Sequence, residues 1–138
     1  SMAEFSDGST IAQLSMPDMR LPIGYALAYP ARIGVPFGRI DWAQVGRLDF
    51  QPPDAVTFRC LALAYQAGRA GGTAPAWLSA ANEVAVDAFL AGRIRWAQIA
   101  DVNDAALQEY EPGPDNTVDD IIAADARARV VAQEVLRR

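Results

Sequence analysis

One stretch decides the fold of this chain: residues 79–92, which read Ser79-Ala80-Ala81-Asn82-Glu83-Val84-Ala85-Val86-Asp87-Ala88-Phe89-Leu90-Ala91-Gly92. Apolar residues recur there at steps of three and four, which predicts a helix with a wide apolar face. Its members are Leu78, Ala81, Val84, Ala85, Ala88 and Phe89. Gly92 suits a left-handed C-cap, and Pro75 suits the first turn. Only a narrow polar stripe faces solvent, so we predict a central helix that its neighbours mostly cover.

The composition is that of one globular core with an extension. The chain has 138 residues, of which 51% are hydrophobic and 21% are charged. No apolar run approaches the roughly 20 residues of a membrane span, and the N-terminus lacks a signal-peptide layout. The net charge of −5 disfavours nucleic acid and anionic lipid, which both need clustered cations. We therefore expect a cytoplasmic protein with no membrane and no nucleic-acid partner.

The residue types present exclude several kinds of active site. The chain has 12 cations, all arginine, and no histidine. A Ser-His-Asp triad, a Schiff-base lysine and a Walker lysine are thus impossible within it. The single cysteine, Cys60, lies in an apolar helical run and is interpreted as a small core residue. Metal sites could use carboxylates alone, but solvated faces or helix caps are the preferred interpretation of the acidic candidates: Glu83, Asp87, Asp119, Asp120 and Asp125.

The N-terminal part predicts a hairpin and then a helix. Asp7-Gly8 separates the short runs 2–5 and 10–14, which is a strong hairpin signal. A hairpin alone is marginal in water, so these strands need a further sheet to join. A helix is expected from Met19 to Tyr29, with Asp18 as its N-cap. Its predicted buried face consists of Ile23, Ala26 and Leu27.

A connecting arm follows, rich in glycine and proline. Only a helical turn at 41–45 and a short strand at 48–50 are expected within it. A structureless connection of this length is unusual in a compact domain, so it links two parts of a larger body. Six apolar residues suggest that it packs along a surface: Val35, Phe37, Ile40, Trp42, Leu48 and Phe50.

The second half predicts a compact four-helix domain. Besides the central helix, helices are expected at Phe58–Arg69, at Trp96–Tyr110 and after a capping box at 117–120. The expected inward residues are Phe58, Leu61, Ala62 and Tyr65 in the first of these helices and Ile121, Ile122, Ala124, Ala128, Val131, Ala132 and Val135 in the last.

No feature of composition or spacing reveals an active site. The glycines of the segment 68–73 could cradle a phosphate, but no strand precedes them, so a helix C-cap is preferred. Asn82 is expected to bond a neighbouring backbone. Trp42, Trp77 and Trp96 are interpreted as core or arm anchors.

Several strings nevertheless resemble the C-terminal part of the 1-deoxy-D-xylulose 5-phosphate reductoisomerase family. They are Ser1-Met2-Ala3-Glu4-Phe5-Ser6-Asp7-Gly8-Ser9, Gln13-Leu14-Ser15-Met16-Pro17-Asp18-Met19-Arg20-Leu21-Pro22-Ile23, Leu48-Asp49-Phe50, Pro53-Asp54, Ala80-Ala81-Asn82-Glu83 and Thr117-Val118-Asp119-Asp120. The resemblance spans nearly the whole chain, and one departure is Ser79, where the family usually has Asn.

The resemblance implies a mostly α fold. A four-helix bundle-like domain at 54–138 would follow a hairpin and helix at 1–30, left over from an α/β catalytic domain, and an arm at 31–53. The missing domains would be partners of this chain, and a homodimer would form through the hairpin sheet.

The resemblance also implies a function for the parent enzyme: NADPH-dependent conversion of 1-deoxy-D-xylulose 5-phosphate to 2-C-methyl-D-erythritol 4-phosphate, with a divalent ion, Mg or Mn. The family's catalytic and metal-binding residues precede this chain, so we expect it to bind no cofactor and to be inactive alone. Pro17 and Met19 are similar to residues lining the family's substrate pocket, although a structural role as helix start and core contact stays open. The alternative is a stand-alone, non-enzymatic helical interaction module.

Overall fold

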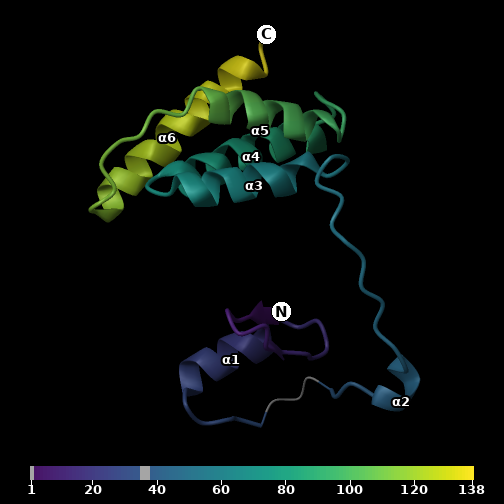
Figure 1. Cartoon of the computed structure of the whole chain (residues 1–138). Helices are drawn as coiled ribbons and strands as arrows, with labels where there is room; N and C mark the ends of the chain where they lie inside the picture. The colour runs from purple at the N-terminus through teal and green to yellow at the C-terminus, as the bar shows by residue number, and fades with distance from the viewer. Residues whose placement is uncertain (1, 35–37) are drawn as a thin grey trace. The chain divides into compact units, whose positions relative to one another are not determined.

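The computed structural model describes residues 2–34 and 38–138, which fall into two compact units, Ser1–Gln51 and Pro52–Arg138 (Figure 1). Helices dominate and the described strands form one hairpin, so the predicted mostly α class is confirmed. The finer division at residues 30 and 53 stays a prediction. Val35 and Phe37, two of the predicted arm contacts, lie outside the described residues.

The hairpin forms where the sequence predicts it. Strands β1 (Met2–Glu4) and β2 (Thr10–Ala12) pair antiparallel. Gly8 supplies the positive φ of the turn, at 85°, and the Asp7 carboxylate accepts the Ser9 backbone N–H at 2.8 Å. All six strand residues are exposed, so the described residues of this unit leave the sheet uncovered.

Helix α1 (Arg20–Ala28) has nearly the predicted bounds, but its N-cap is Met19 and not Asp18. The predicted buried face is wrong, since Ile23 is 52% and Leu27 84% exposed. The half-buried residues are instead Leu21, Gly24, Tyr25 and Ala28. Arg32, in the segment after the helix, partly covers Tyr25, because its guanidinium lies 4.0 Å from the centroid of that ring.

The described residues of the arm form one helical turn and no strand. Helix α2 (Trp42–Val45) is capped by Asp41, whose Oδ1 accepts the backbone N–H groups of Ala43 and Gln44 at 3.0 and 3.2 Å. This confirms the predicted turn. The strand predicted at 48–50 is wrong, because no neighbouring described strand offers it a hydrogen-bonding ladder.

The second unit is built around a central helix, as predicted. It comprises α3 (Arg59–Ala70), α4 (Ala74–Leu90), α5 (Gln98–Gln108) and α6 (Val118–Val135), and α4 contacts the other three (Figure 1). Alanine dominates the buried positions, which are Leu63, Ala67, Ala74, Trp77, Ala80, Ala81, Ala85, Ala88, Val102, Ala106, Leu107, Ala124, Ala128 and Ala132. Side chains this small allow neighbouring helices to approach closely. No helix among the described residues is long and apolar enough to cross a membrane.

Local sequence signals set the boundaries of these helices as predicted. Gly92 adopts φ 70° after α4, and the next N–H, that of Arg93, donates to the Ala88 carbonyl at 2.9 Å. At the start of α6, Asp120 N–H donates to Thr117 Oγ1 at 3.1 Å while the Asp120 carboxylate accepts the Thr117 N–H at 3.0 Å. This is a complete capping box. Gly71, at φ 69°, ends α3, which confirms the C-cap interpretation of that glycine segment.

Two inward faces differ from the prediction. On α3 the predicted residues are exposed, and Leu63 and Ala67 are buried in their place. Cys60 is also exposed, so its interpretation as a core residue is wrong. On α6 the alanines are buried as predicted, but Ile122 is 60% exposed. Because the alanines already fill the narrow gap between α6 and α4, the larger apolar residues lie at its margins.

Trp77 is the tryptophan that anchors the core. It is 3% exposed, and its Nε1 donates to the backbone oxygen of Ala106 on α5 at 2.8 Å. Its ring also meets Tyr110 edge to face, with centroids 5.5 Å apart. Trp42 and Trp96 are 57% and 60% exposed, so neither is a core residue among the described residues, and the interpretation of Trp42 as an arm anchor stays a prediction.

Replacing Trp77 tests this anchor. Trp77→Phe removes the donor to Ala106 and leaves a buried oxygen unpaired, so the free energy of unfolding should fall by about 2 to 3 kcal/mol. Urea denaturation followed by circular dichroism measures the change. Trp96→Phe is the matched control and should change the free energy by less than about 0.5 kcal/mol, since that ring is exposed. Equal effects of the two substitutions would contradict the assignment.

Candidate functional site

The two residues predicted to line a substrate pocket, Pro17 and Met19, lie on the loop between β2 and α1. Asp18 N–H donates to the Met16 carbonyl at 2.8 Å and tightens this loop. Pro17 is exposed, and Met19 is 71% exposed as the N-cap residue of α1. The expected helix start is therefore observed at Met19, while a core contact is absent within the described part of this unit. A role in lining a pocket stays a prediction.

Asp18, which lies between Pro17 and Met19 in the sequence, binds Arg20 through its carboxylate. Its Oδ1 accepts the backbone N–H of Arg20 and the Nε–H of the same residue, both at 2.9 Å, and its Oδ2 pairs with Arg20 Nη2 at 2.5 Å. These bonds from the guanidinium, and then the backbone bond, lower the pKa of the Asp18 carboxyl from 3.8 to about 2. The fork geometry fixes the turn that presents Pro17 and Met19.

A neighbouring cavity of about 450 Å³ in the first unit is mostly apolar. It is lined by Leu14, Ser15, Met16, Arg39, Ile40, Asp41, Trp42, Gln44, Val45 and Leu48. Neither Pro17 nor Met19 is among the residues that line this cavity. The structure therefore does not bring the two predicted site residues into it.

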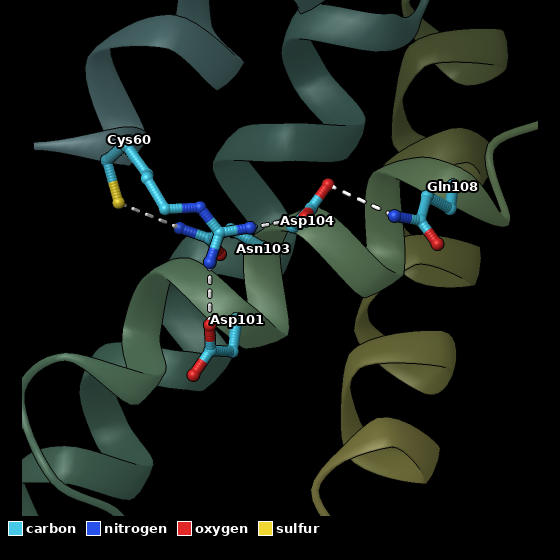
Figure 2. Close-up of polar contacts among 6 residues, drawn as sticks. Cys60, Asp101, Asn103, Asp104 and Gln108 are labelled. Carbon is cyan, nitrogen blue, oxygen red and sulfur yellow. Dashed lines mark hydrogen bonds and ion pairs between the residues drawn. The ribbon is translucent and has the colours of Figure 1, made fainter. Parts of the chain in front are cut away.

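In the second unit, an arginine clamps two helices together (Figure 2). Arg59, at the start of α3, donates from Nη1 to Asp101 at 2.8 Å and from Nη2 to Asp104 at 2.5 Å, both on α5. Gln108 also donates to Asp104, at 3.3 Å. These side chains are all partly exposed, so the cluster sets the registry of α3 and α5 more than it adds stability.

Behind this clamp lies a pair of asparagines that reach each other from α4 and α5. Asn103 Nδ2 donates to Asn82 Oδ1 at 2.9 Å and lies 3.7 Å from the Cys60 sulfur. Asn82 therefore bonds a side chain and not the backbone expected of it. Asn103 is 2% exposed, and its Oδ1 has no hydrogen-bond partner in the described structure.

Sequence reasoning missed Asn103. A signal was present, because Asn103 lies four residues after Ile99 and four before Leu107, in the middle of an apolar helical stripe. A polar side chain at such a position is buried and needs a partner.

Three of the five acidic candidates, Glu83, Asp120 and Asp125, have structural partners. Glu83 and Asp125 both bind Arg129, each at 2.7 Å, which raises the pKa of that guanidinium. Asp120 belongs to the capping box. Among residues 2–34 and 38–138 no three His, Cys, Asp or Glu residues gather as a metal site would require. Nor does a glycine turn lead from a strand into a helix among the described residues, so these residues fit neither a divalent ion nor a dinucleotide.

Comparison with known proteins gives one family. The family model for the DXP reductoisomerase C-terminal domain matches residues 14–131. The 1-deoxy-D-xylulose 5-phosphate reductoisomerase of Ralstonia nicotianae is 54% identical over 138 residues, covering 99% of this chain and 35% of the relative. The enzyme of the same name from Dechloromonas aromatica is 50% identical over 138 residues, covering 100% of this chain and 35% of the relative.

Solved structures agree with the sequence match. The reductoisomerase from Zymomonas mobilis in complex with NADPH has a TM-score of 0.87 and 39% identity, covering 99% of this chain and 36% of that one. A DOX-P reductoisomerase in complex with NADPH, fosmidomycin and magnesium has a TM-score of 0.85 and 38% identity, with the same coverage. This chain thus spans about a third of the length of these relatives. The match to the C-terminal domain, in sequence and in fold, shows that the chain belongs to the 1-deoxy-D-xylulose 5-phosphate reductoisomerase family.

Proposed function

We propose that this chain is the C-terminal third of an NADPH-dependent reductoisomerase that converts 1-deoxy-D-xylulose 5-phosphate to 2-C-methyl-D-erythritol 4-phosphate, in non-mevalonate isoprenoid biosynthesis. The observation that carries the proposal is identity of 50 to 54% with enzymes of that name along the full length of the chain. A stand-alone helical module, the alternative function, gains no support from these matches. The chain by itself is inactive under this proposal.

The cofactors of the whole enzyme are NADPH and a divalent ion, Mg or Mn, under the same proposal. The solved relatives in complex with NADPH and magnesium support this assignment. Because the described residues of this chain fit neither group, the rest of the polypeptide holds both. The metal, when bound there, polarises substrate oxygens, and NADPH supplies hydride.

The contribution of this chain to the reaction is a wall of the substrate pocket. Pro17 and Met19 present apolar surface that excludes water from the reacting groups. The bond between Asp18 and Arg20 holds both in place, since it fixes the intervening turn. Exposure of Met19 in this chain supports the proposal, because a side chain that lines a pocket shared with another domain has no cover here.

The hairpin extends a larger sheet and contributes to a homodimer in this proposal. Its strands have three residues each, all of them exposed, a combination that is marginal without further strands. A cytoplasmic location completes the proposal.

A full-length fusion tests the function. This chain replaces the C-terminal third of the Ralstonia nicotianae relative, and NADPH absorbance is followed on adding 1-deoxy-D-xylulose 5-phosphate and magnesium. We expect metal-dependent turnover from the fusion, because the chain restores the missing pocket wall. The truncated relative and the 138-residue chain alone are the controls and should show none. A folded fusion without turnover would contradict the proposal, as would turnover by the chain alone.

Substitution of Asp18 tests the pocket wall. In the fusion, Asp18→Asn removes the charge that binds Arg20 and loosens the turn, so kcat/KM should fall about tenfold. Asp49→Asn makes the same chemical change in an exposed ion pair of the arm and should leave kcat/KM within about twofold. Indistinguishable kinetics for the two variants would show that the turn does not position the wall.

The titration of Asp18 gives an independent test of the same bond. NMR of the chain should show this carboxyl titrating near pH 2, and Arg20→Gln should raise its pKa toward 3.8 because the guanidinium bonds are lost. Since the pKa is lowered on folding, the stabilisation is complete above pH 3.8 and is lost as the pH falls through about 2. Activity near neutral pH should therefore show no dependence on this group. If the pKa of Asp18 stayed near 2 in Arg20→Gln, the guanidinium would not be the cause of the lowered pKa.

A further inference from the structure

We draw no further inference here: the strongest candidate, the groove of about 490 Å³ beside α6 whose lining combines Val130 and Val131 with Glu109, Glu111 and Glu134, carries nothing, because Arg127 lines the same groove, Arg138 already pairs with Glu109 at 2.9 Å, and nothing in the described structure shows what covers it.

Discussion

Close packing around α4 is the constraint on which the rest of the helical unit depends. Ala80, Ala81, Ala85 and Ala88 are fully buried, and the alanines of α5 and α6 meet them. With side chains this small, the distance between helices is set almost by backbone contact, and any larger residue would force the helices apart. The same closeness brings Trp77 within hydrogen-bond reach of the α5 backbone and Asn82 within reach of Asn103.

Elements whose signals are local could be predicted from the sequence. The turn at Asp7-Gly8, the cap at Asp41, the glycine at the end of α4 and the capping box at 117–120 all form as expected. Each of them depends on atoms a few residues apart, so nothing distant has to be known. The predicted strand at 48–50 failed for the opposite reason, because a strand exists only with a partner to pair with.

The buried faces of α1 and α3 could not be predicted for this chain. Ile23 and Leu27 on α1, and Leu61 and Tyr65 on α3, follow a helical period yet are exposed. Apolar periodicity indicates that one face of a helix is buried in the functional protein, but it does not indicate which segment buries that face. The chain spans about a third of its relatives' length, so under the proposed function these exposed faces are surfaces on which the rest of that enzyme would pack.

The residues of the candidate site also differ in whether a local sequence signal could identify them. Pro17 and Met19 were found through resemblance to a family, since an exposed proline and methionine carry no chemical signature of their own. Asn103 was missed, although it lies in an apolar stripe, because its partner Asn82 is 21 residues away in the sequence. A leucine at 103 would suit a self-sufficient helical bundle better than an amide with an unpaired oxygen. What the amide provides in this structure is the bond to Asn82, which connects α5 to α4 between side chains that are distant in the sequence.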